Sequence, residues 1–152
     1  MGASGAGYSN AHAQLILDSY QHWTGAQLME VKHPNEAFLT LYHAPIVVLS
    51  HGTEADPILN FGNAAALKLW EMNREAFTQM PSRQTAEPMS QADRSEFMQT
   101  VTEQGYITDY SGIRISRTGK RFLIRQTTVW NLVDPKGVYR GQAAAFSSYS
   151  SC

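Results

Sequence analysis

Cysteine is almost absent from the sequence, since the only one is the final residue, Cys152. A disulfide within the chain is therefore impossible, and a lone thiol fits a reducing compartment, so we expect a cytoplasmic protein. Apolar runs of the roughly 18–20 residues that span a bilayer are also missing. The first residues lack the basic and then apolar pattern of a signal peptide, and residues 1–10 are interpreted as a flexible leader.

An excess of charge of either sign is lacking as well. The net charge is −1, the isoelectric point is about 6.5 and only 16% of the residues are charged. This balance gives no electrostatic reason to bind nucleic acid or an anionic membrane, so neither partner is expected. Basic residues do gather between positions 114 and 125, but they surround an expected hairpin turn, where solvated charge is the simpler interpretation.

Patterns of metal-ligating or catalytic residues are missing too. The histidines are His12, His22, His33, His43 and His51. None of them stands at a metal-ligand spacing from another histidine or a carboxylate, and no thiolate is near, so no metal site is expected. No nucleophile and base can be paired from their spacing either. Whether the protein is an enzyme stays open, and the sequence favours a function without catalysis.

What is present is a regular succession of helix and strand patterns in 152 residues, enough for one domain. Residues 11–44 read as an N-terminal helical extension of two helices. The first carries an apolar stripe at helical spacing, formed by Leu15, Ile16, Tyr20 and Trp23. This stripe could pack on the sheet of its own domain or on a second copy, so a homodimer is a possible partner state.

Residues 45–147 alternate between strands and helices and form the expected core. Strands are predicted over 45–51, 58–62, 106–116, 121–133 and 139–146. Between the second and third strand lie helices over 63–72, 73–80 and 90–105, the first two capped by Asn63 and Asn73. The fold class is therefore α+β, a five-stranded antiparallel sheet with helices on one face. Residues 148–152 are left as a C-terminal tail.

Four segments carry a family resemblance: "APIVVLSHGTEADPILNFGNAAALKLWEM", "PSRQTAEP", "GIRISRTGKRFLIRQTTVWNLVD" and "GVYRGQAAAF". Together they resemble the MEKHLA domain, a PAS-like domain found in short stand-alone bacterial or algal proteins and at the C-terminus of plant class III homeodomain–leucine zipper regulators. The resemblance covers residues 12–146. It implies a PAS-like fold and sensing of a small ligand, redox state or light, or protein contacts, and it supplies no catalytic residues.

The cofactor is unknown, and two common PAS cofactors are disfavoured. Flavin photosensors form an adduct through a cysteine in the central helical region, where this sequence has none. Haem sensors often ligate iron through a histidine on the long helix, which over 90–105 also has none. His43 and His51 are expected instead at element boundaries, bonded to backbone. Flavin bound without a covalent link stays open.

Polar side chains in the expected sheet suggest a ligand site. Strict alternation along residues 122–132 puts Gln126 and Trp130 on one face and Arg125 on the other. We expect one of these faces to surround a small polar or anionic ligand, because an arginine suits carboxylate or phosphate. The candidate binding residues are Arg125, Gln126, Trp130 and Gln142 on the sheet, with Trp70, Ser82 and Arg83 from the helices. The alternative is a core tryptophan beside a solvated polar face.

The sequence thus favours a sensory or regulatory domain that binds a small molecule and signals through protein association. The alternative is a ligand-free interaction module that dimerises or docks another protein. A small enzyme using the pocket is the least favoured hypothesis.

Overall fold

Six β-strands with antiparallel pairing dominate the computed structural model, which describes residues 7–86, 96, 97 and 99–152. The strands are β1 (Val47–His51), β2 (Leu59–Gly62), β3 (Tyr106–Ile115), β4 (Arg121–Val133), β5 (Tyr139–Phe146) and β6 (Ser148–Ser151). The helices are α1 (Asn10–Thr24), α2 (Ala37–Tyr42), α3 (Ala64–Trp70) and α4 (Arg74–Phe77), with 3-10 turns η2 (Pro34–Glu36) and η3 (Ser82–Thr85). Residues 96, 97 and 99–104 are also helical.

The sheet joins the two halves of the chain. Its order is β2-β1-β5-β4-β3. The hairpin of β1 and β2 therefore joins the rest of the sheet through β5, and not through β3, the next strand in the sequence. Val47 lies opposite Phe146 and His51 opposite Gln142 across this junction. The predicted α+β fold is confirmed. The predicted helix over 90–105 falls partly outside the described residues.

Three helices begin at side chains that bind their first free backbone N–H groups. Ser9 accepts a hydrogen bond from the His12 amide at 3.1 Å at the start of α1. Asn63 and Asn73 do the same for α3 and α4, at 3.1 and 2.8 Å. Because such caps satisfy donors that the helix itself leaves unpaired, short polar residues before an apolar run mark helix starts. The predicted caps at Asn63 and Asn73 are confirmed.

Helix α1 covers one face of the sheet. Its residue Ile16 is fully buried, and Tyr20 lies edge-on to Trp130 with ring centroids 5.0 Å apart. Trp23 donates its indole N–H to the Asn131 carbonyl at 3.0 Å. The apolar stripe of α1 therefore packs on the sheet of its own domain, the first of the two alternatives that the sequence left open.

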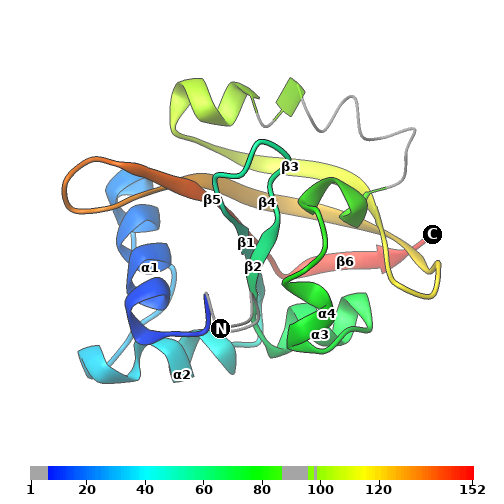
Figure 1. Cartoon of the computed structure of the whole chain (residues 1–152), viewed down its shortest axis with the longest axis horizontal. Helices are drawn as coiled ribbons and strands as arrows, with labels where there is room; N and C mark the ends of the chain where they lie inside the picture. Colours follow the sequence, from blue (N-terminus) through cyan, green and yellow to red (C-terminus); the bar gives the residue numbers. More distant parts are fainter. Residues whose placement is uncertain (1–6, 87–95, 98) are drawn as a thin grey trace.

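Helices α3 and α4 pack on the opposite face, apart from α1 (Figure 1). Trp70 is the centre of this second core, and its ring lies 5.2 Å from that of Phe122 and 6.2 Å from those of Phe77 and Phe146. All three contacts are edge-to-face, the arrangement that aromatic quadrupoles favour. The sheet is thus the middle layer between two separate hydrophobic cores.

Two bulges interrupt the ladder between β3 and β4. Gln126 has φ 51° and Asp109 has φ 63°, both in the left-handed region. Between the pairs Tyr110–Thr127 and Gly112–Ile124, β4 uses one residue more than β3. Such an extra residue locally breaks the alternation of side chains. Thr127 therefore follows Ile124 on the face of α3, and Trp130 lies on the face of α1.

The two ends of the chain differ from the expectation of leader and tail. Within the expected leader, Tyr8 packs on Phe61 and exchanges hydrogen bonds with both backbone groups of Gly62, at 2.9 and 3.1 Å. The expected tail forms β6, which pairs with β4 from Phe122 to Arg125. The free backbone groups along this part of β4 explain the pairing, since buried N–H and C=O groups need partners. No described helix is both long and apolar enough to cross a bilayer.

The hydroxyl of Tyr8 is expected to stabilise the domain. In the Tyr8→Phe variant the Gly62 amide and carbonyl both lose a partner, so we expect the free energy of unfolding to fall by about 1–3 kcal/mol. Urea denaturation measures this difference. Tyr139→Phe is the control, because Tyr139 is exposed. Removal of its hydroxyl should lower the free energy of unfolding by less than about 0.5 kcal/mol. Equal values for the two variants would contradict the role assigned to Tyr8.

Candidate functional site

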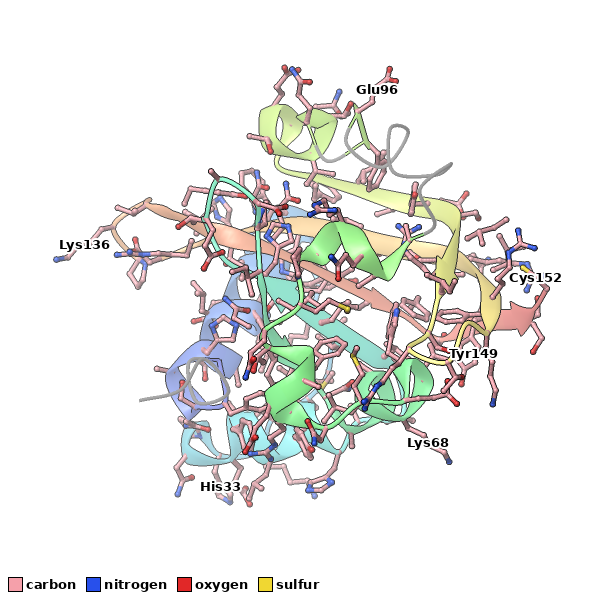
Figure 2. All side chains as sticks on the ribbon, turned by 45° about the vertical axis from the view of Figure 1, so that its right-hand side comes forward. His33, Lys68, Glu96, Lys136, Tyr149 and Cys152 are labelled. Atoms are coloured by element: carbon pink, nitrogen blue, oxygen red, sulfur yellow. The ribbon has the colours of Figure 1, made fainter. Side chains whose placement is uncertain are left out.

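A cavity of about 50 Å³ lies between the sheet and the segment that includes α3 and η3. Trp70 of α3 is buried against the sheet, whereas Lys68 of the same helix points away from it (Figure 2). The lining residues come from every strand except β6. They include Leu49, His51, Leu59, Trp70, Ser82, Thr85, Phe97, Tyr110, Arg114, Ile124, Thr127, Val129, Gln142, Ala144 and Phe146.

Arg114 of β3 supplies the charge of this cavity. Its side chain is buried, with 7% of the residue exposed. The guanidinium donates to the Ile113 carbonyl at 2.9 Å and to the Tyr110 hydroxyl at 3.2 Å. Among the described residues it forms no ion pair with a carboxylate. A buried charge without a counter-charge is costly. This arginine therefore makes the cavity a candidate binding site.

Gly112 leaves room for the conformation of the Arg114 side chain. A Cβ atom at this position would lie 2.7 Å from the Tyr110 hydroxyl oxygen and 3.0 Å from Nη1 of Arg114. Any larger residue would therefore crowd the guanidinium where it passes back over the strand. The absence of a side chain at Gly112 keeps Arg114 over the cavity face of β3.

Two further polar atoms at the cavity have no hydrogen-bond partner among the described residues. They are Nε1 of Trp70 and Oγ1 of Thr127, and each residue is only 1% exposed. Trp70 comes from α3 and Thr127 from β4, so the two residues line the cavity from the helical layer and from the sheet. Buried polar atoms in native proteins are nearly always paired with protein or ordered water. Both atoms therefore have unused capacity for a ligand or water.

A hydrogen-bonded network joins the sheet to the helical residues 99–104. Gln142 donates to Asn131 at 3.0 Å and to the Thr102 hydroxyl at 3.2 Å. Asn131 donates in turn to the Val101 carbonyl at 3.0 Å. This network fixes the amide of Gln142, one of the lining residues, at the cavity wall.

The residues expected to bind a ligand are divided by the structure. Trp70, Ser82 and Gln142 line the cavity. Arg83 does not, because it is exposed and pairs with Asp56 at 3.2 Å. Of the three residues expected from the helical side, Trp70 and Ser82 therefore line the cavity and Arg83 does not.

The expected sheet residues lie elsewhere, and for Trp130 the cause is the bulge at Gln126. Arg125 points to the other face, where it donates to the Ser150 hydroxyl of β6 at 2.7 Å. Gln126 is exposed. Trp130 lies in the α1 core and donates to the Ile16 carbonyl at 3.2 Å. None of the three lines the cavity.

Sequence reasoning assigned Arg114 to a solvated turn, and so missed the arginine that does face the cavity. One signal was present: Gly112 precedes it by two residues, on the same face of a strand. A glycine inside a strand often marks a close approach of other atoms. The structure shows this approach, with Arg114 and Tyr110 meeting above Gly112.

A flavin does not fit the cavity in this conformation. A cavity of about 150 Å³ holds a single benzene ring, whereas this one has about 50 Å³. The lone thiol, Cys152, is exposed at the end of β6 at the periphery of the molecule (Figure 2). His43 is exposed after α2, and the ring of His51 contacts the Gly52 carbonyl at 2.9 Å.

The groups with clearly shifted pKa values lie away from the cavity. Hydrogen bonds from Thr118 and Ser116 lower the pKa of Glu71 to about 2, and burial lowers the pKa of His12 to about 4. Neither residue lines the cavity. Within the described part of the chain, no three histidine, cysteine or acidic residues gather as a metal site.

Solved structures with the same fold are PAS and light-oxygen-voltage domains. The PAS domain of a protein from Colwellia psychrerythraea superposes with a TM-score of 0.61 and 13% identity, over 75% of this chain and 92% of that chain. A light-oxygen-voltage domain studied with a flavin analogue gives 0.60 and 14%, over 76% and 83%. The photo-excited blue-light photoreceptor Vivid gives 0.58 and 13%, over 90% and 91%.

At these identities the likeness shows the PAS fold alone. A comparison with curated proteins finds no significant match. The model of the MEKHLA domain, in contrast, matches residues 10–151, from the start of α1 to the end of β6. The chain therefore belongs to the MEKHLA domain family.

Proposed function

We propose that this MEKHLA domain is a sensory or regulatory module that binds a small molecule in the cavity between the sheet and α3. The observation that carries the proposal is the pair of unpartnered buried atoms, Nε1 of Trp70 and Oγ1 of Thr127. Leaving such an atom without a partner costs about 1–3 kcal/mol. A ligand that bonds to both would recover this cost, which supports binding at this place. A cytoplasmic location, favoured by the lone cysteine, is part of the proposal.

Trp70 also provides a physical connection from the cavity to the surface. Its ring contacts Phe77 of α4, and the same helix carries Arg74. The guanidinium of Arg74 lies 4.5 Å from the ring centre of Tyr8 and 4.6 Å from that of Tyr42. A ligand that shifts Trp70 would therefore act on the N-terminal segment and α2. We propose that the signal leaves from there by association with a second copy or another protein.

A ligand-free interaction module is the second candidate. The small size of the cavity favours it, and the rings of Trp70, Phe122 and Phe146 already pack together in a hydrophobic core on this face of the sheet. In that case the domain would act only through its surface. The two candidates differ in one measurable respect, which is whether the cavity must stay open for function.

The Ala144→Val variant separates the two candidates. Ala144 lines the cavity opposite Val129, so two added carbon atoms would occupy much of the free space. We expect ligand affinity to fall at least tenfold, while the free energy of unfolding changes by less than about 1.5 kcal/mol. The ligand is identified by native mass spectrometry of freshly purified protein or by a thermal-shift screen of small polar molecules.

The control is Ala26→Val, on an exposed loop, which should leave binding unchanged. If the purified protein carries no ligand, the screen finds none, and Ala144→Val still associates with its partner normally, the interaction module is the correct function.

A further inference from the structure

Three residues of the cavity have hydrogen-bond donors without a partner among the described residues. The indole of Trp70 can only donate, and the guanidinium of Arg114 has five N–H groups and no acceptor. Two of those five donate to Ile113 and Tyr110. The hydroxyl of Thr127 can donate as well. A ligand that satisfies all three residues must therefore present acceptors.

The charge of the cavity points to an anion. Arg114 is buried, and the ion pairs of the described residues include Arg83–Asp56, Lys120–Glu71 and Arg140–Asp134. None of them neutralises Arg114. Arginine presents its donors in a planar fork that matches two oxygens of one carboxylate. The need for hydrogen-bond acceptors and the positive charge of Arg114 thus both indicate a carboxylate.

Arg114, Trp70 and Thr127 all line the same cavity. Thr127 lies directly opposite Tyr110 in the neighbouring strand, and Arg114, four residues further along β3, donates to the Tyr110 hydroxyl. Arg114 and Thr127 therefore flank the same tyrosine on the sheet. Trp70 approaches from the helical layer, and its carbonyl accepts a hydrogen bond from the Arg117 amide at 3.1 Å. That bond fixes the end of α3 against the turn that follows β3.

Building on the proposed function, we propose that the cavity binds a small carboxylate anion through Arg114, Trp70 and Thr127. Its volume of about 50 Å³ sets the size. Because a cavity of about 150 Å³ holds a single benzene ring, aromatic acids are too large, and carboxylates of about three or four heavy atoms fit. Formate and acetate belong to this class.

Nuclear magnetic resonance of the indole N–H groups tests the proposal in the full chain. The protein has three tryptophans, so three indole cross-peaks are expected. Trp23 and Trp130 already donate to carbonyls, whereas Trp70 has no partner among the described residues. On titration with sodium acetate or formate, only the Trp70 cross-peak should move, and it should saturate. The Trp70→Phe variant assigns that peak.

Two arginine variants form a matched pair for the charge. Arg114→Gln should weaken acetate binding at least tenfold, whereas Arg125→Gln, on the opposite face of the sheet, should leave it unchanged. If Arg114→Gln does not fold, Gly112→Ala takes its place, because its Cβ would lie 2.7 Å from the Tyr110 hydroxyl and 3.0 Å from Nη1 of Arg114, so that both groups must shift. This variant should also weaken binding about tenfold, since a displaced arginine no longer presents its paired donors.

Acetamide, the neutral counterpart of acetate, separates this inference from the proposed function. If acetamide moves the Trp70 peak as strongly as acetate, or Arg114→Gln binds acetate normally, the anion proposal is overturned while the ligand cavity stands. If acetate and formate leave the peak unmoved and a different ligand is found by native mass spectrometry, the result is the same. If no ligand of any kind moves the peak, both proposals fail.

Discussion

Replacing Asn63 with alanine is expected to lower the free energy of unfolding by about 3–5 kcal/mol. Asn63 is fully buried and uses both ends of its amide. Its oxygen accepts from the amides of Ala66 and Val48, both at 3.1 Å. Its nitrogen donates to the carbonyls of Leu41 and Ile46, at 3.1 and 2.8 Å. Alanine would leave all four backbone groups without this partner at the junction of α2, β1 and α3.

Asn73→Ala is the matched control for this expectation. Asn73 caps α4 in the same way, but its single bond to the Ala76 amide is exposed. Its loss should cost only about 1 kcal/mol, the usual value of a helix cap. Urea denaturation of both variants gives the comparison. Costs of similar size would show that Asn63 acts as a cap and does not tie the three elements together.

Acidification is expected to remove about 3 kcal/mol of stability between pH 6.5 and pH 4 through His12 alone. Burial lowers the pKa of His12 from 6.5 to about 4 in the folded protein. The unfolded chain therefore takes up a proton on this residue at a higher pH than the folded one. The stability from neutral His12 is complete above pH 6.5 and declines as the pH falls to 4.

The environment of His12 explains the sign of this effect. Its Nε2 lies 2.9 Å from the Ser50 hydroxyl, and its ring is 6.0 Å from that of Phe61. No carboxylate is among the causes of its pKa shift, so nothing there favours the charged form. Unfolding free energies measured by urea from pH 7 to pH 4 test the slope. His12→Gln should show a much flatter profile, and an equal slope in that variant would refute the assignment to His12.

The strands and helix starts of this domain could be predicted because their signals are local. The β-branched run before His51 and the polar residues Asn63 and Asn73 each act within a few residues of themselves. The succession of two strands, helices and three strands then indicated a single sheet, and the family resemblance implied a PAS-like fold. Residues 121–133 and 139–146 were predicted as strands with the bounds that the structure shows.

The faces of β4 could not be predicted, because nothing in the sequence announces the bulge. Gln126 adopts a left-handed conformation that is usual for glycine and asparagine, and rare for glutamine. Strict alternation therefore placed Trp130 beside Phe122 and Ile124, whereas the structure places Thr127 there. Arg114 was missed for another reason, because its place near the expected hairpin turn favoured solvated charge.

The ends of the chain were hard to predict for a different reason. Residues 148–151 are serines around Tyr149, with no apolar alternation, so their pairing with β4 depends on a tertiary partner. Tyr8 stands in a glycine-rich segment, and its role depends on Gly62, 54 positions away. Contacts of this kind are set by the assembled sheet and leave no local pattern.

The bulges at Asp109 and Gln126 have a consequence for how related sequences should differ in length. Each strand contains one extra residue, on either side of the pair Tyr110–Thr127. Loss of one extra residue alone would slide the rest of β3 along β4. Loss of both would leave every other pair, and every inward or outward side chain, where it is now. Insertions and deletions at these two positions should therefore occur together in evolution.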